Sequence, residues 1–188
     1  MDQVSTDQID LVVRAGADCG LNAITSFTGG QFWELNPDGV GGQSFIDPAV
    51  QSSLVVEGTA TGTPCPEPLQ LAQSETGVAV RCSDGVAVYS NQNERWEGIS
   101  PLSALSVTWR SGTVPDVVAV LRGSECKGLE IRAFPADGSA FNGEELGCVP
   151  VVNTDAAVNI ASAGPNLWLW SGDEWLSSQD GGASWNGR

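Results

Sequence analysis

The sequence predicts an all-β fold, on the basis of its composition, its short alternating segments and an internal repeat. Glycine accounts for 23 of the 188 residues, whereas charged residues make up only 16%. This composition is typical of short strands joined by tight turns. No window of about a dozen residues has the 3.6-residue apolar periodicity of an amphipathic helix without an interruption. The length is sufficient for one sizeable hydrophobic core, so we expect a single domain over residues 1–188.

Three pairs of short apolar segments predict β-hairpins, because polar turn residues separate the two members of each pair. The pairs are 77–82 with 86–90, 117–122 with 129–134, and 167–170 with 175–178.

The strongest signal is a repeat. Residues 77–96 align without a gap with residues 166–185, and both copies end on a tryptophan, Trp96 and Trp185. Aromatic residues close four such units, at Trp33, Trp96, Phe141 and Trp185. The last two spacings, 45 and 44 residues, match the length of one four-stranded propeller blade, roughly 40–50 residues. We therefore expect a β-propeller-like domain of about four four-stranded blades of roughly 45 residues. Residues 37–68, rich in glycine, proline and serine, are expected to form an insertion or an irregular blade segment.

The last copy carries a recognisable motif. Ser178-Gln-Asp180-Gly-Gly182-Ala-Ser184-Trp185 resembles the Asp-box (BNR) pattern Ser-x-Asp-x-Gly-x-Thr-Trp, with serine in place of threonine. Degenerate copies end at Trp33, Trp96 and Phe141. The chain thus resembles the sialidase-like and photosystem II assembly-factor-like propellers. The resemblance implies that each box holds the turn between the outer strands of a blade, away from the central channel where ligands usually bind. Its role is then structural.

The five cysteines bear on the cellular compartment. Because members of each pair fall within one repeat, we predict the disulfides Cys65–Cys82 and Cys126–Cys148. Cys19 is then either a buried free thiol or a residue whose partner lies outside this chain. The predicted disulfides indicate an extracellular or cell-envelope location, with a signal or anchor absent from the sequence. The alternative is five buried, reduced thiols in the cytosol.

Charge and residue types limit the partners. A net charge of −15 argues against nucleic acid and anionic lipid, and no apolar run is long enough to cross a bilayer. Histidine and Cys-x-x-Cys pairs are absent, so neither a zinc site nor Ser/His or Cys/His catalysis is expected. We predict no cofactor and assign no metal. An open sheet edge would permit self-association.

Three tryptophans, Trp168, Trp170 and Trp175, are the candidate binding residues. Trp168 and Trp170 share one face of a strand, opposite Leu167 and Leu169. Packing between blades is the expected role. A platform for a sugar ring or a partner's apolar side chain is the alternative.

These observations predict a non-catalytic binding or scaffold domain that recognises a protein or a cell-wall glycan. The alternative is a divergent sialidase-like glycoside hydrolase, which would use an arginine cluster and a tyrosine nucleophile. The only tyrosine, Tyr89, lies in an outer-turn box. Arg14, Arg81 and Arg122 close corresponding strands and supply the one conceivable cluster.

Overall fold

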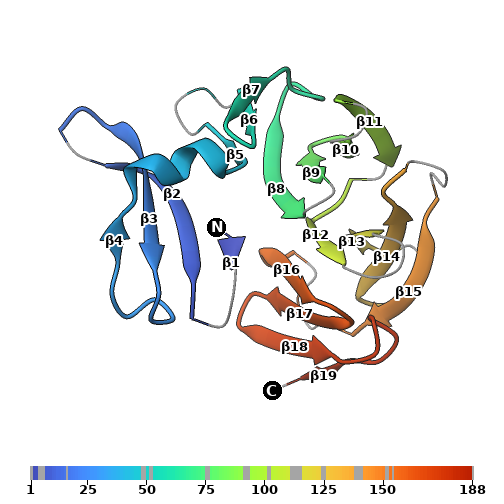
Figure 1. Cartoon of the computed structure of the whole chain (residues 1–188). Helices are drawn as coiled ribbons and strands as arrows, with labels where there is room; N and C mark the ends of the chain where they lie inside the picture. The colour runs from blue at the N-terminus through green and yellow to red at the C-terminus, as the bar shows by residue number, and fades with distance from the viewer. Residues whose placement is uncertain are drawn as a thin grey trace. The chain divides into compact units, whose positions relative to one another are not determined.

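Five antiparallel β-sheets and a 3-10 helix make up the described part of the chain (Figure 1). The computed structural model describes residues 2–3, 7–15, 17–47, 50, 53–74, 77–90, 94–100, 103–110, 116–123, 126–137, 142–150, 153 and 155–187. The chain consists of two compact units, Met1–Gly62 and Thr63–Arg188.

The first unit contains two sheets, each a sequential antiparallel meander. The four-stranded sheet consists of β1 (Asp2–Gln3), β2 (Ile9–Ala15), β3 (Gly20–Ser26) and β4 (Glu34–Leu35). The helix η1 (Pro37–Gly42) leads into the three-stranded sheet of β5 (Phe45–Ile46), β6 (Leu54–Val56) and β7 (Thr59–Thr61).

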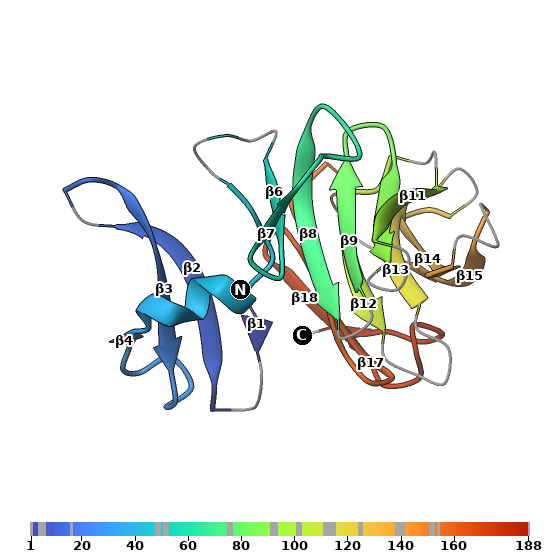
Figure 2. The ribbon, with the colours of Figure 1, turned by 45° about the horizontal axis from the view of Figure 1, so that its top comes forward.

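The second unit contains three four-stranded meanders. Their strands are β8 (Pro68–Ser74), β9 (Gly77–Cys82), β10 (Val86–Ser90) and β11 (Arg95–Ser100); β12 (Ser106–Arg110), β13 (Asp116–Arg122), β14 (Leu129–Pro135) and β15 (Glu144–Val149); β16 (Val158–Ala163), β17 (Asn166–Ser171), β18 (Glu174–Ser178) and β19 (Asn186–Gly187). The first strands of these sheets, β8, β12 and β16, lie innermost, and β11, β15 and β19 lie at the periphery (Figures 1 and 2).

The predicted fold class is confirmed: the chain is all-β, with the small antiparallel sheets of a β-propeller. The six strands of the three predicted hairpins are present within one or two residues of the expected bounds. The structure has five sheets where the sequence indicated about four. The fifth sheet, β5–β7, lies inside the 37–68 segment, and its strands of two or three residues are too short to produce a recognisable repeat.

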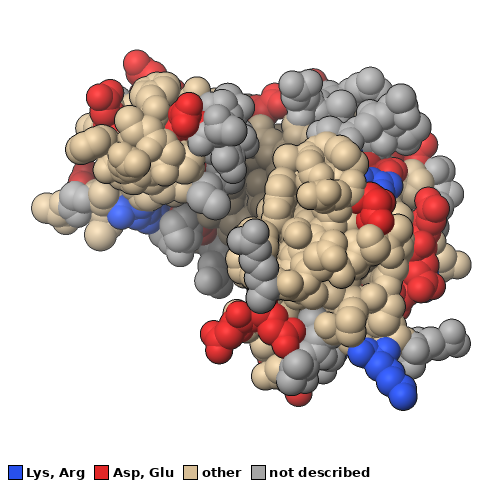
Figure 3. All heavy atoms as spheres, turned by 90° about the horizontal axis from the view of Figure 1, so that it is seen from below, with Lys and Arg blue, Asp and Glu red and all other residues tan. Residues whose placement is uncertain are grey.

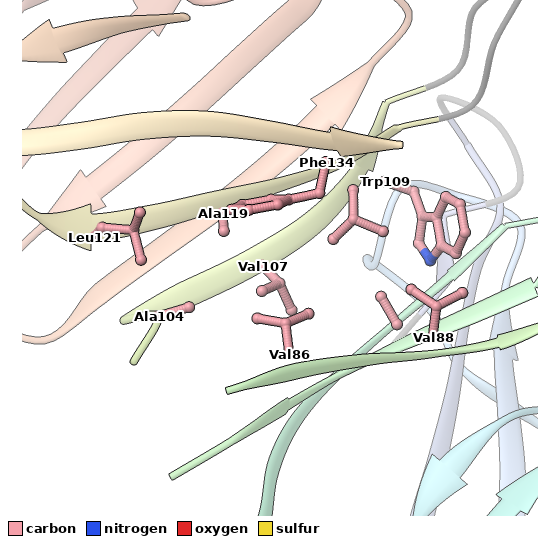
Figure 4. Close-up of a cluster of buried hydrophobic side chains, with 10 residues drawn as sticks. Val86, Val88, Ala104, Val107, Trp109, Ala119, Leu121 and Phe134 are labelled. Atoms are coloured by element: carbon pink, nitrogen blue, oxygen red, sulfur yellow. The ribbon is translucent and has the colours of Figure 1, made fainter. Parts of the chain in front are cut away.

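The middle sheet of the second unit is buried on both faces, because successive side chains of β13 point to opposite sides and enter two different clusters. Val117, Ala119 and Leu121 belong to one buried cluster, with Val107, Trp109 and Phe134 among its other members (Figure 4). Val118 and Val120 belong to a second buried cluster, with Leu167 and Leu169. Residues 117–121 are all buried, which explains why this segment is an unbroken apolar run.

Two disulfides are present, and they are the predicted pairs. Cys65 bonds Cys82 across 17 residues, and Cys126 bonds Cys148 across 22 residues. Closing loops of this length stabilises the folded chain by about 3 kcal/mol each in the chain-entropy description. Cys19 is a free thiol and is exposed, so the first of its two alternatives, a buried thiol, is wrong, and a partner outside this chain stays a prediction. It lies in the turn between β2 and β3, with a φ of 51°.

Among the described residues, no helix has both the length and the apolar character needed to span a bilayer.

Candidate functional site

An uncharged, tryptophan-rich face covers one side of the sheet β16–β19. Trp168 and Trp170 of β17 point away from Leu167 and Leu169, which are completely buried. Trp175 of β18 pairs directly with Trp170, and residues opposite each other in an antiparallel pair share a face. We call these three side chains, with the Asn166, Ser177 and Asn186 side chains of the same face, the tryptophan face.

The tryptophan face is accessible to solvent. Trp170 is 42% exposed, and Trp168 and Trp175 are half-buried. Packing between blades, the role expected for these three tryptophans, stays a prediction, and Trp170 is the most exposed of the three. On the opposite face of the sheet, Leu167, Leu169 and Leu176 belong to a buried cluster.

A shallow hollow of about 480 Å³ lies on this face. Its lining residues are Asn166, Trp168, Trp175, Ser177, Ser178, Gln179, Asn186 and Gly187. The lining combines two indole rings with amide and hydroxyl groups and contains no charged side chain. Aromatic rings offer stacking surfaces, and amides offer both hydrogen-bond donors and acceptors. This chemistry suits a neutral ligand that has apolar faces and polar edges.

The neutrality of the tryptophan face contrasts with the rest of the protein. The chain carries a net charge of −15. On the side seen in Figure 3, acidic side chains gather in several places and basic side chains are few.

The turn between β18 and β19 contains the best match to the box motif, and hydrogen bonds hold it together. The Ser178 Oγ accepts the Gly182 N–H at 2.8 Å, and Asp180 Oδ1 accepts the Ser184 N–H at 2.9 Å. The Trp185 Nε1–H donates to the Gly182 carbonyl at 2.9 Å. The Ser184 hydroxyl also donates to Asp180 Oδ2 at 2.6 Å, and this bond, with those from Ser184 N–H and Ser178, lowers the pKa of Asp180 to about 2.

The turn between β3 and β4 has the same hydrogen bonds although its sequence differs. The Ser26 Oγ accepts the Gly30 N–H at 2.9 Å, and the Thr28 hydroxyl accepts the Phe32 N–H at 2.9 Å. The Trp33 Nε1–H donates to the Gly30 carbonyl at 3.0 Å. Here Thr28 takes the place of Asp180, so the carboxylate can be replaced by another acceptor.

The two box-like segments that end at Trp96 and Phe141 lie only partly within the described residues. Trp96 of β11 packs edge-on against Tyr89 of β10, with ring centroids 5.2 Å apart. Its indole N–H is buried and has no hydrogen-bond partner among the described residues. Residues 91–93 and Phe141 lie outside the described residues.

A sialidase-like hydrolase would need a cluster of arginines, and the three candidates each have a different partner in the structure. Arg14 pairs with Asp47 at 2.7 Å, and Arg122 pairs with Asp155 at 3.1 Å. Arg81 donates to the carbonyl of Ala104 at 3.3 Å, and burial lowers the pKa of its guanidinium. The ring of Tyr89 packs edge-on against Trp96. Within the described part of the chain, no group of three or more potential metal-binding cysteine or carboxylate side chains occurs.

No protein-family profile matches the chain, and no curated protein matches it. A solved structure described as "YCF48 bound to D1 peptide" is similar, with 13% sequence identity and a TM-score of 0.39. The alignment covers 88% of this chain and 59% of that one, so this chain spans less than two thirds of the length of that protein.

Proposed function

We propose that this chain is a non-catalytic binding domain of an extracellular or cell-envelope protein, and that its tryptophan face contacts the partner, a protein or a cell-wall glycan. The observation that carries the proposal is the grouping of one exposed and two half-buried tryptophans on one uncharged face. Exposed aromatic residues grouped on one surface are typical of recognition sites.

The two disulfides support the proposed location, because disulfides persist in oxidising compartments. We also propose that the turns at Ser26 and Ser178 are Asp boxes with a purely structural role. Their side-chain hydrogen bonds are directed at their own backbone. The separate partners of Arg14, Arg81 and Arg122 give no support to a sialidase-like site.

The test is a titration of the full chain with neutral oligosaccharides, such as chitotetraose and cellotetraose, followed by tryptophan fluorescence. A parallel capture experiment uses cell-envelope proteins from the native source. Replacing Trp168 and Trp175 with alanine should weaken binding of the active ligand by about tenfold or more, because both rings line the hollow. The control is Leu69→Ala, which removes an apolar side chain that is 48% exposed on β8, in a different sheet.

Two results would overturn the proposal. Binding that the Trp168/Trp175 double variant leaves unchanged would separate recognition from this face. Cleavage of an oligosaccharide or a sialoside, detected by mass spectrometry, would show that the domain is catalytic.

A further inference from the structure

The three sheets of the second unit pack on one another in chain order. We call the face of a sheet that packs on the next sheet its leading face. On the first sheet, β8–β11, Val86 and Val88 lie on the leading face and share a buried cluster with Val107 and Trp109 of the middle sheet (Figure 4). The leading face of the middle sheet, β12–β15, packs in turn against the last sheet, β16–β19.

The repeat identifies the tryptophan face as the equivalent of a leading face. In the alignment of residues 77–96 with 166–185, Ala79 corresponds to Trp168 and Val86 corresponds to Trp175. The strand register agrees, because Ala79 lies opposite Val88, whereas Trp168 lies opposite the corresponding residue, Ser177. The tryptophans therefore occupy the side of the last sheet by which the first sheet contacts its successor.

The equivalent positions differ in exposure. Ala79 and Val86 are buried beneath the middle sheet. Trp168 and Trp175 are half-buried, and Trp170 on the same face is 42% exposed. The largest side chains thus lie at positions that a neighbouring sheet covers in the first repeat, and covering them would remove apolar surface from water.

A polar side chain on the innermost strand completes the comparison. Gln70 of β8 lies opposite Arg81, and Asn159 of β16 lies opposite Trp170, the residue that corresponds to Arg81. The Gln70 amide accepts the N–H of Val107 at 3.1 Å and donates to the carbonyl of Val107 at 3.2 Å. Gln70 thus binds the backbone of β12, which lies against β8 and β9. Asn159 has the same kind of amide, and it is exposed.

These equivalences restrict what can cover the tryptophan face. A β-strand presents a backbone N–H and C=O from one residue along the same edge, which an amide such as that of Asn159 can bind together. Because indole rings are larger than the side chains of Ala79 and Val86, the facing residues of such a strand should be small. A second copy of this chain would add another net charge of −15, so charge repulsion opposes self-association.

We propose that the tryptophan face binds an extended strand of a partner protein, in the place that β12 takes on the first sheet. Asn159 binds the backbone of this strand, and small apolar side chains of the strand pack on Trp168 and Trp175. The proposal rests on the proposed function, because it names the class of partner that the same face recognises.

The test is a titration of the full chain with seven-residue peptides in which alanine or valine alternates with threonine, followed by tryptophan fluorescence. A second set of peptides carries N-methyl groups on the alanine and valine residues. Their side chains are unchanged, but the N–H groups that would bind Asn159 are missing. The protein variants are Asn159→Ala and Asn159→Gln. Asn159 is exposed, so both should fold, and the second keeps the amide and supplies the residue found at position 70.

We expect the natural chain to bind the unmethylated peptides, and Asn159→Ala should lower the affinity about three- to tenfold, as the loss of hydrogen bonds does. Asn159→Gln should restore most of the affinity, and N-methylation should weaken binding to the natural chain. Affinity that neither Asn159→Ala nor N-methylation changes would overturn the proposal. Dimerisation that Trp168→Ala/Trp175→Ala abolishes, measured by sedimentation, would also overturn it, because the occupant would then be a second copy.

The same titrations separate this proposal from the proposed function. If chitotetraose or cellotetraose binds through Trp168 and Trp175 and no peptide binds, the partner is a glycan. The strand proposal then fails, and the proposed function stands. Peptide binding that the Trp168→Ala/Trp175→Ala variant leaves unchanged would overturn both.

Discussion

The hydroxyl of Ser106, a residue with no exposed surface, donates a hydrogen bond to Oε1 of Gln70 at 3.0 Å and thereby joins the innermost strands of two adjacent sheets. The same hydroxyl accepts the N–H of Ile160, on the innermost strand of the third sheet, at 3.1 Å. The Gln70 amide also makes two hydrogen bonds with the backbone of Val107. Its Oε1 accepts the Val107 N–H at 3.1 Å, and its Nε2 donates to the Val107 carbonyl at 3.2 Å. One polar network therefore connects β8, β12 and β16, where strands from different sheets approach each other.

Ser106→Ala should destabilise the second unit by about 1–3 kcal/mol, because the buried N–H of Ile160 loses its acceptor and Gln70 loses a donor. Chemical denaturation measures the change. Ser103→Ala is the matched control, since the Ser103 hydroxyl makes an exposed hydrogen bond to Ser83. A loss no larger than that of the control would show that the network contributes little.

Stability should depend on pH through Asp180. Hydrogen bonds, first of all from the Ser184 side chain, lower its pKa to about 2 from the usual 3.8, so the folded state favours the ionised carboxylate. The resulting stabilisation should be complete above about pH 4 and disappear as the pH falls through about 2. The difference in unfolding free energy between the natural chain and Asp180→Asn should shrink over this interval. Ser184→Ala should move the decline to higher pH, and a difference that is constant with pH would contradict the assignment.

The thiols should react unequally. Alkylation of the native, unreduced chain should modify Cys19 alone, because the other four cysteines form disulfides. Intact mass spectrometry counts the modified residues. Five reactive thiols would contradict both disulfides and remove the support for an oxidising compartment.

Two glycines should resist replacement because a side chain would collide with backbone. A Cβ at Gly77 would lie 2.3 Å from the Tyr89 carbonyl oxygen, and one at Gly128 would lie 2.1 Å from that of Val149. Gly77→Ala and Gly128→Ala should each destabilise the chain by about 1–3 kcal/mol, as overpacking does. Gly98→Ala is the control, since a Cβ there meets nothing within 4 Å. Equal midpoints of thermal unfolding for all three variants would contradict this prediction.

Much of the fold could be predicted from the sequence because its signals are local. Short apolar segments bounded by turn residues, such as 77–82 and 117–122, predict strands, and the structure has strands there. The cysteine pairs were also predictable, because both members of each pair lie in one repeat. The sheet β5–β7 lies in the segment 37–68 that was expected to be an insertion or an irregular blade segment, but its strands were not predicted one by one because strands of two or three residues carry almost no periodicity.

The candidate binding surfaces were decided by tertiary structure. Sequence alternation places Trp168 and Trp170 on one face and Leu167 on the other, but it gives no information about which face another sheet covers. Likewise, the Ser26 and Ser178 turns share a serine, two glycines and a tryptophan, but only the structure shows that Phe27 and Phe32 are exposed. The sequence thus determined the strands and the disulfides, which depend on nearby residues. Exposure depends on how separate sheets pack, and only the three-dimensional structure determines it.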